Sequence, residues 1–410
     1  MNRAALFLLA LAASLAPQML AAQDAPFEQV ERGRYLAVLG DCTACHTLPG
    51  KPPFSGGVAI DTPFGRLVGP NITPDRETGI GTWTEEDFQR TMSEGIGKGG
   101  VHLYGAMPFT AYTKVSRADN AAILAYLRTL QPVHNAVESN QLPFPFNIRT
   151  ALIGWNLINF TKGEYVPDEA HDAQWNRGAY LVQGLGHCGT CHTPKNILGG
   201  DKEGQFLKGA VVDGWLAPDI TGDRTQGIGK WSVEELVQYL KTGVNRYDLA
   251  SGPMADVVTN SSQHWTDADL TAVATYLKSL TPANPMTRPP LRADAPEMLA
   301  GRALYEDRCS ACHVPDGAGI DRLFPKLADA PLVSNENPAS LIRVVLAGSR
   351  AVATDARPTG PAMPAFARNL SDEDVAQVLT YVRNSWGNAA PAVSAADVAG
   401  ARKEMEAPER

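Results

Sequence analysis

The chain has 410 residues, with 36 Lys and Arg against 44 Asp and Glu, which gives a formal net charge of −8 at neutral pH. An acidic protein repels phosphate backbones, so nucleic acid is excluded as an expected partner. All six cysteines fall in three tight pairs. No cysteine therefore stands outside these pairs.

Residues 1–22 carry Arg3 near their start, continue as an apolar stretch and end on small residues. This pattern predicts a secretory signal peptide. Its apolar core is shorter than the about 20 residues that cross a bilayer, although an uncleaved membrane anchor is the alternative. Nothing after residue 22 has the length and apolarity of a membrane helix. We therefore expect a periplasmic protein that would reach a membrane only through partner subunits or a surface segment.

The three cysteine pairs share the pattern Cys-x-x-Cys-His. Residues three and four apart lie on one face of a helix, so both thiols can reach the two vinyl groups of a haem while the imidazole lies under the iron. The pattern predicts three covalently bound c-type haems. For any one pair, a zinc site or a redox pair is the alternative. The attaching cysteines are Cys42, Cys45, Cys188, Cys191, Cys309 and Cys312, and the predicted iron ligands beside them are His46, His192 and His313.

An internal repeat organises the chain into three units. The first two units share a Pro-Asn/Asp-Ile-Thr stretch and a Gly-Ile-Gly-x-Trp stretch, which a helix opening at Thr84 or Ser232 follows; the third unit lacks both stretches. We expect Trp83 and Trp231 to fill space beside haem. Each unit ends on a stretch with apolar residues at helical spacing behind a Ser or Thr cap. These closing helices are predicted at 116–130, 266–280 and 371–382.

Each unit also has a methionine between its cysteines and its closing helix, in a segment predicted to be a loop. Proline beside methionine stiffens the loop and helps hold a weak thioether ligand against iron. His102 and His264 are the alternative ligands for the first two irons, and Met92 is disfavoured because it lies in a helical pattern. The predicted second axial ligands are Met107, Met254 and Met363.

Two axial ligands leave the iron no position for substrate or oxygen, so the expected chemistry is one-electron transfer. The connector between the first two units is unusually apolar at 142–146 and 151–160. It is predicted to be a helix packed between domains, with a docking or membrane-surface element as the alternative. The tail after Gly387 is expected to be loosely ordered.

On these motifs, methionine loops and duplicated stretches, the chain resembles the triple-haem cytochrome c subunits of bacterial membrane-bound dehydrogenases for alcohol, aldehyde, gluconate, sorbitol or fructose. The resemblance implies an electron-transfer subunit and not an enzyme by itself. A separate flavin, quinone-cofactor or molybdenum catalytic subunit would supply electrons, and ubiquinone or a terminal oxidase would receive them at the periplasmic face of the cytoplasmic membrane. A free periplasmic shuttle is the alternative, followed by a self-sufficient multihaem enzyme such as a peroxidase.

The resemblance implies an all-α fold of three tandem cytochrome c domains, in which helices and long loops wrap one haem each. The expected boundaries are a signal peptide at 1–22, the first cytochrome c domain at 23–134, a linker with an apolar segment at 135–170, the second domain at 171–285, a linker at 286–294, the third domain at 295–390 and a tail at 391–410.

Overall fold

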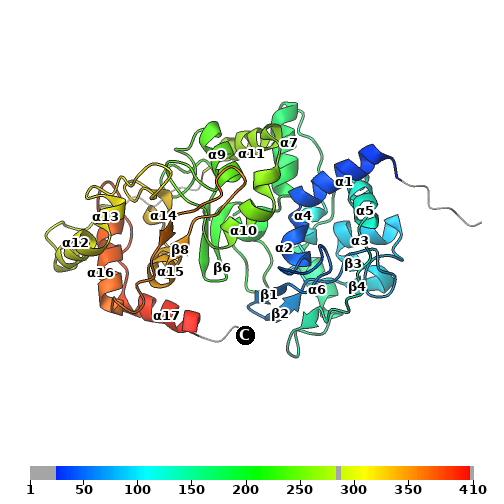
Figure 1. Cartoon of the computed structure of the whole chain (residues 1–410), viewed down its shortest axis with the longest axis horizontal. Helices are drawn as coiled ribbons and strands as arrows, with labels where there is room; N and C mark the ends of the chain where they lie inside the picture. The colour runs from blue at the N-terminus through cyan, green and yellow to red at the C-terminus, as the bar shows by residue number, and fades with distance from the viewer. Residues whose placement is uncertain (1–24, 203, 283–287, 407–410) are drawn as a thin grey trace, which may run out of the picture.

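The computed structural model describes residues 25–202, 204–282 and 288–406. The predicted signal peptide at 1–22 lies outside these residues. The three units lie in a row, with the second between the first and the third (Figure 1). Within the described ranges, none of the helices combines the length and the apolarity that crossing a membrane requires.

Each unit pairs its first helix with its closing helix. The first helices are α1 (Phe27–Leu39), α7 (Ala173–Gln183) and α12 (Pro296–Arg308), and the closing helices are α5 (Arg117–Arg128), α11 (Asp267–Ser279) and α16 (Asp372–Arg383). The closing helices begin where the sequence predicts them. Their caps Ser116, Thr266 and Ser371 accept hydrogen bonds from backbone N–H groups of the first turn, which satisfies donors that a helix leaves unpaired.

Each of these helix pairs crosses at a glycine. A Cβ atom at that glycine would overlap the carbonyl oxygen of the closing helix, so any larger residue forces the two backbones apart. The distances from the ideal Cβ position to the oxygen are 1.8 Å for Gly33 and Ala122, 2.0 Å for Gly178 and Ala272, and 2.1 Å for Gly301 and Gln377. The same close approach therefore sets the frame of all three units.

Shorter helices make up the rest of the helical structure. The Cys-x-x-Cys-His segments form α2 (Cys42–His46), α8 (Gly189–His192) and α13 (Ser310–His313). The helices predicted after Thr84 and Ser232 are α3 (Glu85–Glu94) and α9 (Val233–Thr242), and both caps form complete capping boxes. The remaining helices are α4 (Phe109–Tyr112), α6 (Ala151–Asn159), α10 (Pro253–Asn260), α14 (Pro331–Ser334), α15 (Ala339–Ala347) and α17 (Ala395–Glu406), with 3₁₀ turns at Lys98–Gly100 and Ser262–His264.

Short antiparallel strands qualify the all-α prediction, so the chain is mostly helical. They are β1 (Ala59–Thr62), β2 (Gly65–Val68), β3 (Ile96–Gly97), β4 (Val101–His102), β5 (Asn140–Gln141), β6 (Lys208–Val212), β7 (Trp215–Asp219), β8 (Ser349–Arg350) and β9 (Ala362–Met363). They pair as β1–β2–β5, β3–β4, β6–β7 and β8–β9. Between β6 and β7, Asp213 and Gly214 both have positive φ angles, as a two-residue hairpin turn requires.

The hydrophobic core divides differently from the repeat. One continuous cluster of buried side chains includes Leu36 and Ile123 of the first unit together with Leu181 and Leu270 of the second. The third unit has a separate cluster around Tyr305. The first two units therefore share one core, and the third is built around its own.

The expectation of a loosely ordered tail was wrong. Helix α17 packs against α15 and α16, and Val393 and Val398 are buried in the core of the third unit. Arg402 of α17 also forms an ion pair with Asp372 and donates a hydrogen bond to the carbonyl of Ala367. The composition of this segment, rich in Ala and charged residues, hid an apolar stripe that is enough to hold a helix.

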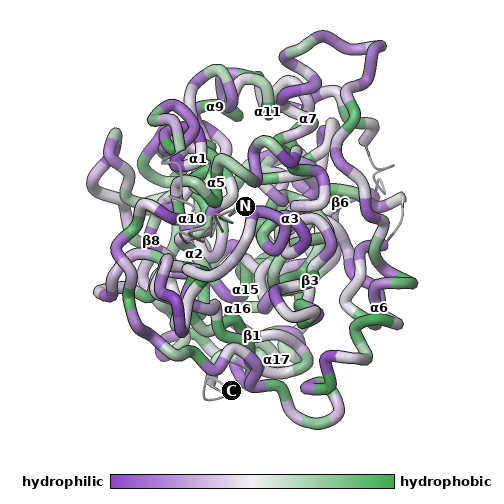
Figure 2. The backbone as a smooth tube through the Cα atoms, turned by 90° about the vertical axis from the view of Figure 1, so that its right-hand side faces the viewer, coloured by the Kyte–Doolittle hydropathy of each residue, from purple (hydrophilic) through white to green (hydrophobic). Residues whose placement is uncertain are grey.

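Helix α6 lies in the apolar connector and leaves part of its surface uncovered. Its Trp155 packs on Phe109 of the first unit and donates a hydrogen bond to the Leu198 carbonyl of the second. The side chains of Leu157 and Ile158 on the same helix are 84% and 72% exposed, and Figure 2 shows this helix at the edge of the view. The helix packs between the units as predicted, while its outer face stays apolar and open.

Replacement of Gly33 by Ala should destabilise the first unit, because the new methyl group overlaps the Ala122 carbonyl oxygen. Overpacking of this kind costs about 1–3 kcal/mol of unfolding free energy. Gly154→Ala is the matched control, because its Cβ meets nothing within 4 Å in α6 and the change should be neutral or slightly stabilising. Denaturant unfolding of the two variants measures the difference, and equal midpoints would contradict the tight crossing.

Candidate haem sites

The three Cys-x-x-Cys-His segments share one local structure. Each forms a short helix directly after the first helix of its unit, which places its cysteines and histidine beside the core. Burial raises the pKa of the Cys42 and Cys188 thiols to about 12, so both are protonated at neutral pH. Among the described residues, no three His, Cys, Asp or Glu side chains group as a metal site.

The histidine of each segment is held by a proline carbonyl. The distances from Nδ1 to the carbonyl oxygen are 2.7 Å for His46 and Pro70, 2.7 Å for His192 and Pro218, and 3.0 Å for His313 and Pro325. A carbonyl oxygen only accepts, so each Nδ1 carries the proton and each Nε2 keeps a free lone pair for a metal. Burial also lowers the pKa of all three imidazoles, which favours this neutral form.

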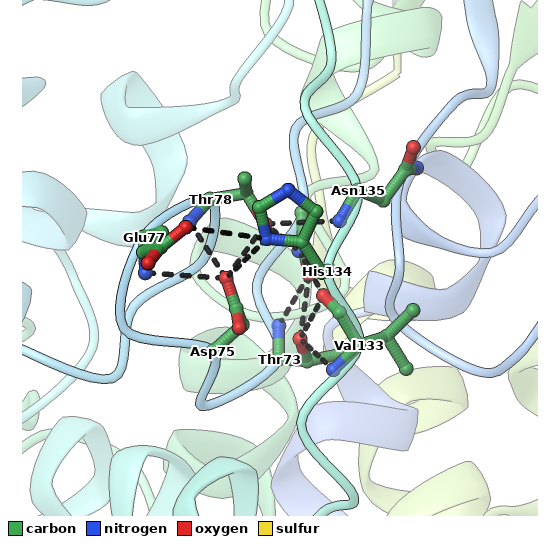
Figure 3. A network of polar contacts seen from close by, with 8 residues as sticks. Thr73, Asp75, Glu77, Thr78, Val133, His134 and Asn135 are labelled. Carbon is green, nitrogen blue, oxygen red and sulfur yellow. Dashed lines mark hydrogen bonds and ion pairs between the residues drawn. The ribbon is translucent and has the colours of Figure 1, made fainter.

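Polar contacts hold the first of these prolines in place. Asn71, which follows Pro70, accepts a hydrogen bond from the backbone N–H of Thr73 at 2.9 Å and donates to the Val133 carbonyl at 2.7 Å. The loop is thereby tied to the segment after the closing helix (Figure 3). In the second unit, Asp219 takes the place of Asn71 and accepts from the N–H of Thr221. The Pro-Asn/Asp-Ile-Thr stretch is thus the support of the histidine.

Asp75 completes this network. Its carboxylate accepts hydrogen bonds from the backbone N–H and the hydroxyl of Thr78, at 2.7 and 2.8 Å, and lies 3.8 Å from His134 Nδ1 (Figure 3). These hydrogen bonds lower the pKa of Asp75. The loop that carries Pro70 is therefore stabilised by the ionised form of this carboxyl group.

The third unit reaches the same histidine geometry with another loop. Pro325 lies two residues before Leu327, whose N–H donates a hydrogen bond to the Gly317 carbonyl. This bond draws the segment back toward the cysteine helix. Pro325 was not predicted as a partner of His313, because the third unit lacks the repeated stretch. Pro325 follows His313 by 12 residues, whereas Pro70 and Pro218 follow their histidines by 24 and 26 residues, so the spacing gave no signal either.

The three predicted methionine ligands are all partly buried, in different local structures. Met107 lies in a bend before α4, and Met363 lies on β9. Met254 was predicted in a loop but occupies the first turn of α10, because Gly252 has a φ of 54° and Pro253 is well suited to the first helical position. Proline therefore starts a helix here instead of stiffening a loop.

The alternative histidine ligands differ from each other. His264 is exposed in the 3₁₀ turn before α11, which is a poor position for an iron ligand. His102 lies on β4, and its buried Nδ1 has no hydrogen-bond partner among the residues that the structure describes. His102 thus stays the competitor of Met107 in the first unit.

Unpartnered polar atoms in the second unit fit a haem. Within the described part of the chain, the buried indole N–H of Trp231 and the hydroxyl of Thr221 have no hydrogen-bond partner. Leaving such a donor unsatisfied costs about 1–3 kcal/mol. The two carboxylates of a haem are acceptors of the kind that these groups lack. Trp231 stacks on Tyr247 with ring centroids 5.6 Å apart. Its indole N–H could therefore donate to a haem carboxylate, a role beyond the predicted filling of space.

Comparison with known proteins bears on all three units. The family model described as cytochrome c matches residues 30–131, 176–281 and 298–386. The gluconate 2-dehydrogenase cytochrome c subunit of Pantoea cypripedii is 40% identical, with 92% of this chain and 90% of that protein covered. The cytochrome c subunit of alcohol dehydrogenase (quinone) from Gluconobacter oxydans is 38% identical, covering 92% and 83%. The fructose dehydrogenase cytochrome subunit of Gluconobacter japonicus is 38% identical, covering 89% and 81%.

Replacement of Met107 by Leu should remove about one third of the thioether-to-iron absorption and lower one reduction potential, while three haems stay attached. Visible spectra and a redox titration of the holoprotein measure both effects. Met92→Leu is the control, because Met92 is a buried methionine of the same unit, on α3. An unchanged spectrum in the Met107 variant would assign the ligand to another residue, with His102 as the first candidate.

Asp75→Asn should destabilise the first unit at neutral pH. Because the folded pKa of Asp75 lies below its unfolded value, the carboxylate contributes stability above the unfolded pKa of about 3.9. That contribution disappears as the pH falls through the lower folded pKa. Denaturant unfolding from neutral to acid pH should therefore show a difference between wild type and variant that shrinks with acidity. A difference that is constant with pH would contradict the role of the charged form.

Proposed function

Because this chain belongs to the cytochrome c family, we propose that it is the electron-transfer subunit of a periplasmic dehydrogenase complex and carries three covalently bound haems. The observation that carries the proposal is the geometry that recurs in all three units, a cysteine helix whose histidine donates from Nδ1 to a proline carbonyl. When bound, haem c supplies reversible one-electron chemistry at its iron.

The residues of this chain divide the work of holding each haem. The two cysteines of each motif would attach the ring, and the histidine and methionine would occupy the axial positions of the iron. In the first unit these residues are Cys42, Cys45, His46 and Met107; in the second, Cys188, Cys191, His192 and Met254; and in the third, Cys309, Cys312, His313 and Met363. Two protein ligands at each iron favour electron transfer over catalysis on a bound substrate.

The arrangement of the three units in a row suggests the path that electrons take through the chain. Ser261 of the second unit donates to the Val38 carbonyl of the first at 2.6 Å, and the Leu216 N–H of the second unit donates to Ser340 of the third at 2.7 Å. The second unit thus contacts both of the others. Electrons that enter at one outer unit and leave at the other would cross the second unit.

The two ends of this path are proposed from the relatives. Proteins similar over most of this chain are named as cytochrome subunits of gluconate, alcohol and fructose dehydrogenases, so a dehydrogenase catalytic subunit is the proposed donor. Ubiquinone or a terminal oxidase at the cytoplasmic membrane is the proposed acceptor. The exposed apolar face of α6 is a surface that such assembly would cover.

Carbon monoxide binding tests the closed coordination of the irons. The reduced holoprotein should bind no carbon monoxide rapidly and stoichiometrically, because both axial positions of each iron are filled.

Affinity purification of the full chain from its native membranes should also bring down a dehydrogenase catalytic subunit whose substrate reduces the haems. Rapid stoichiometric carbon monoxide binding would indicate a haem enzyme, and a monomeric pool without a partner would indicate a free shuttle.

A further inference from the structure

The first helices of the first two units carry the same short motif, Arg-Gly-x-Tyr, at 32–35 on α1 and 177–180 on α7. Within its own unit, each arginine pairs with the aspartate in the first turn of the closing helix. Arg32 Nε lies 2.8 Å from Asp119 Oδ1. Arg177 Nε lies 2.8 Å from Asp269 Oδ1, and its Nη2 lies 2.9 Å from Oδ2.

The tyrosine of each motif crosses to the other unit. The Tyr35 hydroxyl of the first unit donates to Asp269 Oδ2 of the second at 2.8 Å, and the Tyr180 hydroxyl of the second donates to Asp119 Oδ2 of the first at 2.5 Å. Each hydroxyl also accepts from the backbone N–H of the cap that precedes that aspartate, Thr266 or Ser116. The two Tyr–Asp–Arg bridges are therefore reciprocal, as in a twofold-symmetric interface.

Both bridges are built around a buried carboxylate. The side chains of Asp119 and Asp269 are 3% and 10% exposed. Burial alone would raise the pKa of Asp269, but the hydrogen bonds from Arg177 and Tyr35 outweigh it and lower the pKa. A hydrogen bond to a charged acceptor is about twice as strong as one between neutral groups. The bridges are thus strong contacts at two separate points of one interface.

The bridges flank the place where the two attachment segments meet. His187, which precedes Cys188, contacts the Tyr112 ring of the first unit with centroids 5.7 Å apart. The Tyr112 hydroxyl donates to the Gly40 carbonyl at 2.7 Å. A Cβ at Gly40 would lie 3.4 Å from both Cys42 Sγ and a methyl group of Leu185 in the second unit. Any movement at this interface therefore moves one attachment segment against the other.

The third unit shows what happens without the motif. Ala300 and Ala303 stand at the positions of the arginine and the tyrosine. Asp374, the equivalent of Asp119 and Asp269, turns back and accepts hydrogen bonds from the backbone N–H and the hydroxyl of its own cap, Ser371. The third unit also keeps a separate core. The motif and the paired arrangement thus occur together.

We propose that the two Tyr–Asp–Arg bridges position the haems of the first and second units relative to each other and so set the rate of electron exchange between them. This inference rests on the proposed function. Electron tunnelling falls steeply with distance, so an interface that opens slows the exchange. Two anchors at separate points resist both sliding and rotation, which a single anchor does not.

Tyr35→Phe and Tyr180→Phe, alone and together, test the proposal in the full chain with its haems. Each change removes one hydrogen bond to a charged carboxylate and keeps the ring, so it should raise the fraction of open interface roughly tenfold. In the double variant the two increases in the open fraction should multiply, because both bridges break when the interface opens. Magnetic coupling between the ferric haems, measured by electron paramagnetic resonance, should weaken, and electron equilibration after flash reduction should slow in the same order.

Tyr276→Phe is the matched control. Its hydroxyl accepts a hydrogen bond from Gln183 Nε2 at 2.8 Å within the second unit, so its loss should leave the coupling and the rate unchanged. All variants should keep three haems and their spectra. Unchanged coupling and rate in the double variant would overturn the positioning role. Missing haems or an open iron in the wild type would instead overturn the proposed function. The single variants provide the same test if the double variant does not accumulate.

Discussion

The close crossing of the first and closing helices is the contact on which the rest of each unit depends. At Gly33, Gly178 and Gly301 the backbones approach so closely that no side chain fits between them. This approach fixes the point from which the cysteine helix departs, and it brings the cap of the closing helix beside the first helix. The polar contacts of Arg32 and Arg177 with that first turn are possible only because the crossing places them there.

The histidine support shows how one geometry arises from two kinds of sequence. In the first two units a repeated stretch holds the proline through an Asn or Asp side chain that accepts from the backbone two residues later. In the third unit the carbonyl of Pro325 is delivered by main-chain hydrogen bonds of an unrelated loop. Each histidine needs a hydrogen-bond acceptor next to its Nδ1–H. This need fixes where the acceptor atom lies and leaves the type of residue that carries it free.

Much of the local structure could be predicted from the sequence because short-range physics decides it. The capped closing helices follow from Ser116, Thr266 and Ser371 with helical spacing behind them. The hairpins and α17 were missed for opposite reasons. The β6–β7 turn has a local signal, the pair Asp213 and Gly214, whereas α17 depends on its packing against α15 and α16, which no local pattern shows. The helical start at Pro253 was missed because proline stiffens loops and begins helices equally well.

The candidate haem ligands stay predictions from residue type and spacing, whereas the groups that support the histidines could not be predicted from the sequence. The candidate cysteines, histidines and methionines can be picked out in the sequence by residue type and spacing. The partners of His46 and His313 are backbone carbonyls, which any residue carries, so no sequence pattern identifies them. The two tyrosine bridges connect residues that are 234 and 61 positions apart, Tyr35 with Asp269 and Tyr180 with Asp119. Local sequence patterns hold no information about such contacts.

The reciprocal pairing of the first two units limits how a third unit can attach to them. Two copies joined through the same face use that face completely, so a third copy cannot be added by repeating the contact. The third unit accordingly attaches to the second through other groups, among them Leu216 with Ser340 and the ion pair of Lys230 with Asp329. A symmetric pair thereby becomes a row with two unlike ends. Under the proposed function, two unlike ends would allow the electron donor and the electron acceptor to recognise different units of the chain.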